Sequence, residues 1–171
     1  MNAAWWKGAQ TASLRGRTFW RCIEGAFAAT ALESGPNYLE GGRYSVAREF
    51  SAVYLSENKD LAHLEKTQGR DIFEGLEDLS FEFVTAVHIP DLTHPELQGR
   101  LHKDFGISLA ELTAPGVVAY QRTQPVGKSI FNAGLPGLLA PSAHPSLKGQ
   151  GSWRNLVLFP ANLLSRWLVR A

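Results

Sequence analysis

Residues 51–69, SAVYLSENKDLAHLEKTQG, pass from a strand pattern into a helix pattern and decide the class of fold. In residues 51–57, apolar Val53 and Leu55 alternate with Tyr54, which is the period-two pattern of a strand with one face in the core. We therefore expect a short strand here, with Tyr54 on the face opposite to Val53 and Leu55.

A helix is expected to follow this strand directly. Ser56 or Asn58 can serve as its N-cap, two leucines one turn apart give it an apolar stripe, and Gly69 marks its end. Glu65 adjoins the second of these leucines, so it lies at the boundary of the apolar stripe. Its carboxylate therefore need not point into bulk water.

The rest of the chain holds more strand patterns than long helix patterns. Residues 79–90, LSFEFVTAVHIP, alternate most clearly and predict one continuous strand that ends at Pro90. Because strands outnumber long helices, we expect an α+β fold with a strongly bent, mainly antiparallel sheet and short helices. The other expected elements are a strand at 17–25, a loop at 33–42, a loop-like stretch with one short helix at 91–112, a helix at 126–133, a turn at 134–136, a strand at 154–160, and a strand or a helix at 162–170.

Composition and charge narrow the class of protein. With 171 residues we expect a single domain over 1–171, with a peripheral N-terminal segment at 1–14. Seventeen Lys and Arg residues against sixteen Asp and Glu leave a formal charge of +1, so direct binding to nucleic acid is not expected. The single Cys22 excludes an internal disulfide, and no stretch has the length and apolar character of a membrane span or a secretory leader. These features favour a cytoplasmic protein.

Familiar catalytic motifs are absent from the sequence. It contains no P-loop, no GxGxxG after a strand, no HExxH and no GxSxG, which excludes the usual NTPase, dinucleotide-binding, zincin and hydrolase classes. The five histidines lack the spacing of metal ligands, so we expect structural or surface roles for them and no metal site.

Arg43 follows two glycines in GGRYS, residues 41–45. In isolation this pattern is typical of a hairpin turn with a solvated arginine. The alternative is that Arg43 and the carboxylate of Glu65 meet in one pocket. The segment PSAHPS, residues 141–146, likewise reads in isolation as a loop in which Ser142 caps a turn.

Taken in order, these motifs resemble those of the RES domain, the toxin half of RES–Xre toxin–antitoxin systems. FWRCI resembles the family's opening strand, GGRYS its glycine–arginine–aromatic motif, SAVYLSENKDLAHLE its strand-then-helix unit, and GLLAPSA followed by NLVLFP its serine-bearing segment. The resemblance covers most of the chain. The residues that these motifs supply are Arg21, Arg43, Tyr44, Tyr54, Glu65, Ser142 and Asn155.

The resemblance implies a fold similar to ADP-ribosyltransferases, with NAD⁺ as substrate rather than as a resident cofactor. The bond between nicotinamide and ribose is the implied target. The implied catalytic residues are Arg43, Glu65 and Ser142, and the implied substrate-binding residues are Arg21, Gly42, Tyr44, Tyr54 and Asn155.

The chemistry of these side chains suits NAD⁺. A guanidinium, from Arg21 or Arg43, can bond two oxygens of a pyrophosphate at once, and glycines beside Arg43 would let backbone approach the ligand. Glu65 would stabilise positive charge on the ribose and orient the nucleophile, while Tyr54 would stack on nicotinamide or bond the ribose. Ser142 is expected to be an orienting donor and not a nucleophile, because no motif gives it a histidine base.

Three functions stay open from the residues alone. The first is cleavage of NAD⁺ with water or phosphate as acceptor, by a glycohydrolase or phosphorylase that depletes the cell's NAD⁺. The second is transfer of ADP-ribose to a protein, and the third is a non-catalytic domain that only binds a partner. The resemblance implies an Xre-like helix-turn-helix antitoxin as that partner, in a hetero-oligomer where DNA binding belongs to the antitoxin.

Overall fold

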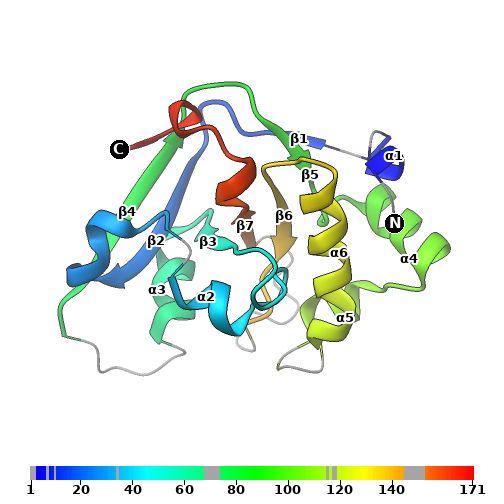
Figure 1. Ribbon diagram of the computed structural model, residues 1–171, viewed down its shortest axis with the longest axis horizontal. Helices are drawn as coiled ribbons and strands as arrows, with labels where there is room; N and C mark the ends of the chain where they lie inside the picture. Colours follow the sequence, from blue (N-terminus) through cyan, green and yellow to red (C-terminus); the bar gives the residue numbers. More distant parts are fainter. Residues whose placement is uncertain are drawn as a thin grey trace.

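An antiparallel sheet of six strands organises the molecule, in the order β6-β7-β3-β2-β4-β8. It curls strongly, so that β2 and β4 turn away from the plane of β6 and β7 (Figure 1). The computed structural model describes residues 3–6, 8–9, 11–33, 35–67, 74–114, 116, 119–144 and 153–171. The strands of this sheet are β2 (Thr18–Glu24), β3 (Val53–Ser56), β4 (Leu76–Phe83), β6 (Gly137–Pro141), β7 (Arg154–Leu158) and β8 (Leu168–Arg170); a second, two-stranded sheet pairs β1 (Thr11–Ser13) with β5 (His88–Pro90).

Strand alternation gives the large sheet two distinct faces. On the face that we call the front, Tyr54 of β3 lies beside Val157 of β7, and the next pair on this face places Ser56 beside Asn155. The opposite, back face carries Val53, Leu55 and their neighbours in one apolar cluster. The expected orientation of Tyr54, away from Val53 and Leu55, is therefore confirmed.

Helices cover the front face from two sides and leave a gap between them. One side is formed by α4 (Pro95–Phe105), α5 (Leu109–Thr113) and α6 (Tyr120–Asn132), whose apolar residues pack with Leu138 and Val157 of the sheet. The other side is α3 (Lys59–Thr67), which lies against β2. In Figure 1 the two groups stand on either side of β3, β7 and β6. The remaining elements are α1 (Ala3–Trp6), α2 (Gly35–Glu40) and 3₁₀ turns at Gly25–Thr30, Pro160–Asn162 and Ser165–Trp167.

Asn58 begins α3 as one of the two expected caps. Its side-chain oxygen accepts from the backbone N–H of Asp60 at 2.7 Å and of Leu61 at 3.4 Å. This satisfies donors that have no partner within the helix. The expected end of the helix at Gly69 falls outside the described residues.

The expected continuous strand over 79–90 is wrong. It is broken after Phe83, and its second part becomes β5 in the other sheet. The buried side chains keep the same parity across the break, with Phe81 and Phe83 before it and Val87 and Ile89 after it. The alternation of buried apolar residues therefore continues across the bend, and the sequence gives no sign that the strand is broken.

Residues 91–112 are mostly helical rather than loop-like, with α4 and α5 separated by three residues. Gly106 closes α4 in the left-handed conformation (φ 64°), which a glycine adopts without steric cost. Ser108 and Glu111 then form a reciprocal capping box that begins α5. The expected helix at 126–133 in fact begins at Tyr120, with Pro125 inside its first turns.

The expected loop at 33–42 is wrong, because it contains the six-residue helix α2. Of the two alternatives at 162–170, the strand is present as β8, after a 3₁₀ turn. Among the described residues of the segment expected to be peripheral, 1–14, Trp6 and Leu14 are buried in the core. Among the described residues, no helix is both long and apolar enough to cross a bilayer.

Candidate functional site

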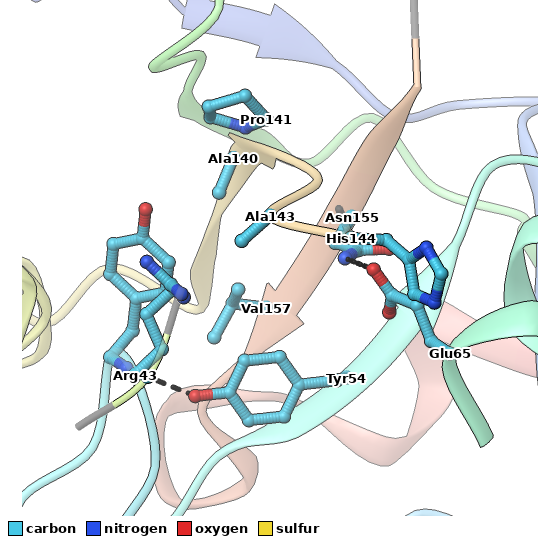
Figure 2. A pocket seen from close by; sticks show the side chains of 11 residues that line it. Arg43, Tyr54, Glu65, Ala140, Pro141, Ala143, His144, Asn155 and Val157 are labelled. Carbon is cyan, nitrogen blue, oxygen red and sulfur yellow. Dashed lines mark hydrogen bonds between the residues drawn. The ribbon is translucent and has the colours of Figure 1, made fainter. Parts of the chain in front are cut away.

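A cavity of about 350 Å³ opens on the front face, in the gap between the two helical groups. Figure 2 shows Arg43 and Glu65 on opposite walls of it, with Tyr54 along a third wall and Val157 of the sheet between them. Tyr44 and Asn155 also line this cavity. The structure thus brings together an arginine and a carboxylate that are separated by a strand and a helix in the sequence.

Glu65 is held in place through one of its two oxygens. Its Oε1 accepts from the hydroxyl of Ser142 at 2.7 Å and from Nδ2 of Asn155 at 2.6 Å. No hydrogen bond to Oε2 occurs among the described residues. The carboxylate is therefore fixed in orientation while its second oxygen keeps its capacity to accept.

Ser56 extends this network and was not expected from the sequence. Its hydroxyl, which is buried, donates to Oδ1 of Asn155 at 2.8 Å. An amide whose oxygen accepts from Ser56 must present its NH₂ group to Glu65, so Ser56 fixes which way the amide points. The sequence held one indication of this role: Ser56 lies two residues after Tyr54, so both side chains are on the same face of the strand.

Ser142 sits at the end of β6, where it also caps a turn as expected. Its Oγ accepts from the backbone N–H of His144 at 3.2 Å while it donates to Glu65. His144 itself lines the cavity, and Figure 2 shows its ring next to Glu65 and Asn155. Sequence reasoning gave His144 only a structural or surface role, since spacing along the chain does not reveal that it lies next to Glu65.

Arg43 is half-buried, and its guanidinium bonds the end of α5. Nη1 donates to the carbonyl of Leu112 at 3.2 Å and Nη2 to that of Ala114 at 2.6 Å, and the group lies 5.9 Å from the ring centroid of Tyr120. A guanidinium has five N–H groups, so these two contacts position it without using its full capacity. The solvated hairpin arginine is therefore the wrong alternative.

The turn that carries Arg43 is clamped by α6. Thr123 donates to the carbonyl of Arg43 at 2.5 Å, and Gln124 donates to the carbonyls of Gly42 and Ser45 at 2.9 and 3.1 Å. One turn further along, Gly127 lets the helix backbone pass close to Tyr44, because a Cβ at Gly127 would lie 2.0 Å from the carbonyl oxygen of Tyr44.

Gly42 makes room for a protein side chain. A Cβ at this position would lie 2.8 Å from the hydroxyl oxygen of Tyr54, and that hydroxyl accepts from the backbone N–H of Tyr44 at 3.0 Å. The expected close approach of backbone to ligand at these glycines is therefore replaced by the packing of Tyr54.

Burial perturbs both tyrosines of the site. It raises the pKa of Tyr54 to about 12 and raises the pKa of Tyr44 further above its ordinary value. The ring of Tyr44 is 1% exposed, and its hydroxyl finds no hydrogen-bond partner among the described residues. Tyr44 lines the cavity, but its hydroxyl is buried, so this neutral group is not open to solvent.

Arg21 lines the second hollow described below together with Tyr54 and Glu65, but its guanidinium points to the other face of the sheet. On β2 it lies between Trp20 and Cys22, which face α3 on the front of the sheet, so its own side chain leaves from the back. There its guanidinium donates to the carbonyl of Ala31, and burial lowers its pKa. A role for the Arg21 side chain beside Glu65 is therefore not supported by its position.

A second hollow of about 350 Å³ adjoins the first along β2 and α3. Tyr54 and Glu65 line both hollows, and Ser56 and Trp20 line the second. Glu65 therefore stands at the boundary between two spaces, each of the size that small-molecule sites occupy.

Comparisons with known proteins cover most of the chain. The family model of the RES domain matches residues 18–167. Among solved structures, a chain of the crystal structure of the M. tuberculosis MbcT–MbcA toxin–antitoxin complex is similar with a TM-score of 0.69 and 17% sequence identity, over 93% of this chain and 84% of that one. No curated protein matches the sequence. The structural likeness agrees with the α+β domain and curled antiparallel sheet described above.

Proposed function

This chain belongs to the RES domain family, and on that premise we propose that it is the toxin enzyme of a toxin–antitoxin pair and cleaves the nicotinamide–ribose bond of NAD⁺. The observation that carries the proposal is the placement of Arg43 and Glu65 on opposite walls of one cavity. A carboxylate and a guanidinium so placed suit a ligand with a cationic glycosidic centre at one end and a pyrophosphate further along.

Glu65 is suited to the bond-breaking step. When the bond between the ribose C1′ and nicotinamide breaks, the electron pair leaves with nicotinamide, which becomes neutral, and positive charge develops on the ribose. A carboxylate near that carbon stabilises the charge. Because Oε1 is held by Ser142 and Asn155, Oε2 is the oxygen that would accept from a ribose hydroxyl or from the attacking nucleophile.

NAD⁺ is a large ligand, and the two adjoining hollows together offer it more room than either one alone. A ligand that crosses their common boundary would place its central bonds beside Glu65 and Tyr54, which line both spaces. Arg43 would then bond the pyrophosphate within the first hollow.

The partner follows from the same family premise. The similar structure is that of a toxin–antitoxin complex, which supports an antitoxin as the partner of this chain as well. We propose an Xre-like helix-turn-helix protein in this role, since the near-neutral charge of this chain gives it no electrostatic basis for binding DNA itself.

The test is NAD⁺ consumption by the purified chain without antitoxin, with and without phosphate and with identification of the products. We expect NAD⁺ to be lost and nicotinamide to appear. We also expect Glu65→Gln, which keeps the shape of the side chain and removes its charge, to slow the reaction by about 10²-fold or more. Glu40→Gln, at an exposed position of α2, is the matched control and should leave the rate unchanged.

Two outcomes would contradict the proposal: intact NAD⁺ after incubation with the free chain, or a Glu65→Gln variant as active as the wild type. NAD⁺ labelled in the ADP-ribose part distinguishes the acceptors. Label that remains on small molecules indicates water or phosphate as acceptor, and label that moves to a protein band indicates ADP-ribosylation of protein.

A further inference from the structure

We propose a binding site for a divalent transition-metal ion of the zinc type, formed by Cys22, His63 and Asp78. The three residues come from β2, α3 and β4, and Cys22 and Asp78 are direct register partners on neighbouring strands. Their potential ligand atoms all lie within 4.8 Å of one another. Cys22 also lines the second hollow, so this site borders the proposed NAD⁺ site, but metal binding does not depend on that function.

The distances are close to those between the ligands of a tetrahedral zinc ion: the sulfur–nitrogen distance matches, and the nitrogen–oxygen distance is about 0.5 Å longer. Bonds of about 2.3 Å to sulfur and 2.0 Å to nitrogen or oxygen place a sulfur and a nitrogen about 3.6 Å apart, and a nitrogen and an oxygen about 3.3 Å apart. In this structure Sγ of Cys22 lies 3.5 Å from Nδ1 of His63, and that nitrogen lies 3.8 Å from Oδ1 of Asp78. An ion could bind here with small adjustments of side chains.

The same three residue types could also form a nucleophile–base–acid relay, but the geometry excludes one. In a relay the histidine uses one ring nitrogen toward the nucleophile and the other toward the carboxylate. Here both Cys22 and Asp78 face the same Nδ1 of His63. Three ligand atoms that converge on one point are the arrangement that a metal requires.

The surroundings allow an ion to enter and to be balanced in charge. The side chain of His63 is 54% exposed, so the site is open to solvent. Asp78 presents Oδ1 to His63 and Oδ2 to Lys59, whose Nζ lies at 3.3 Å, so the carboxylate can bind an ion without giving up the lysine. Three protein ligands leave the fourth position of a tetrahedral ion to water.

Metal binding would change the protonation of Cys22. Burial, with a further contribution from Asp78, raises the pKa of the Cys22 thiol to about 11, so the thiol is protonated in the metal-free protein. On binding, sulfur bonds the metal and the thiol proton passes to solvent. The ion would then connect α3 to β2 and β4. His63 and Glu65 are two positions apart on α3, about 200° around the helix, so the connection is made on a different side from Glu65.

The experiment uses the full chain without a polyhistidine tag, freed of metal by a chelator, and titrated with Zn²⁺ and Co²⁺. We expect one equivalent of Co²⁺ to give a sulfur-to-cobalt charge-transfer band in the near ultraviolet. Zn²⁺ at about 100 times its dissociation constant should raise Tm by about 5 to 10 °C.

Variants identify the ligands. Cys22→Ser should remove the charge-transfer band, and His63→Gln, at an exposed position where folding is not at risk, should weaken Zn²⁺ binding by at least about tenfold. His102→Gln on α4 changes another exposed histidine and should alter neither readout. Absence of both the band and the Tm shift would overturn the proposal. A Tm shift of equal size in His63→Gln would also overturn it, because the ion would then bind elsewhere.

Discussion

Two glycines in helices, Gly127 of α6 and Gly99 of α4, predict opposite effects of the same substitution to alanine. A Cβ added at Gly127 would lie 2.0 Å from the carbonyl oxygen of Tyr44 and 2.9 Å from its Cα. A Cβ added at Gly99, which is exposed, would meet nothing within 4 Å. Neither glycine has a positive φ, so backbone conformation does not distinguish them.

The magnitudes follow from these contacts. At Gly99, alanine removes the entropic cost of glycine in a helix, and the free energy of unfolding should rise by about 0.5 to 1 kcal/mol. At Gly127 the helix and the backbone of Tyr44 would have to separate by more than 1 Å, against the bonds of Thr123 and Gln124 that hold this turn. Overpacking in a well-packed core costs about 1 to 3 kcal/mol, and a clash with backbone belongs at the upper end of that range.

Urea unfolding followed by circular dichroism measures both variants directly. We expect Gly127→Ala to lower the free energy of unfolding by about 3 kcal/mol, which corresponds to a fall in Tm of about 6 to 12 °C for a domain of this size. Gly99→Ala should raise the urea midpoint slightly. If Gly127→Ala proves as stable as the wild type, the close contact between α6 and the Arg43–Tyr44 turn does not exist, and this account of how Arg43 is positioned is wrong.

Two further predictions concern the site. Ser56→Ala leaves Oδ1 of Asn155 buried without its donor. We therefore expect urea unfolding to show a free energy of unfolding lower by about 1 to 3 kcal/mol, and NAD⁺ to be lost more slowly. Unchanged stability and rate would contradict the role of Ser56. Burial raises the folded pKa of Tyr54 to about 12, above the unfolded value near 10, so its contribution is complete below pH 10 and is lost as the pH rises toward 12. Stability should fall over that window, and less in Tyr54→Phe.

Part of this site could be predicted from sequence because local patterns fix the faces of single elements. Period-two alternation correctly placed Tyr54 opposite the core residues of β3, and the leucine stripe placed Glu65 at the edge of its helix. The same reasoning could not compare faces between strands. Alternation within β2 places Arg21 on the face opposite to Trp20. Only the pairing of Trp20 with Ser56, which is on the front, shows that the side chain of Arg21 is on the back of the sheet.

Contacts that join distant segments were beyond sequence reasoning. Ser142 and Asn155 reach Glu65 across 77 and 90 positions, and Arg43 reaches Ala114 across 71. The resemblance to a family supplied these residues as a set, but it supplied neither their bonds nor the part played by Ser56. Likewise, apolar residues alternate without interruption over residues 79–90, so the sequence did not show that β4 and β5 belong to different sheets.

The structure also shows which contacts set the separation between the cavity wall that carries Arg43 and the wall that carries Glu65. The Tyr54 hydroxyl fills the space beside Gly42 and accepts from the backbone of Tyr44, which fixes the turn that carries Arg43. The same strand, β3, ends two residues before the Asn58 cap of the helix that carries Glu65. One residue of the central sheet thus connects to both walls. The separation of the guanidinium and the carboxylate is therefore set by β3 and the segments joined to it, so that the proposed ligand would find both groups already in position.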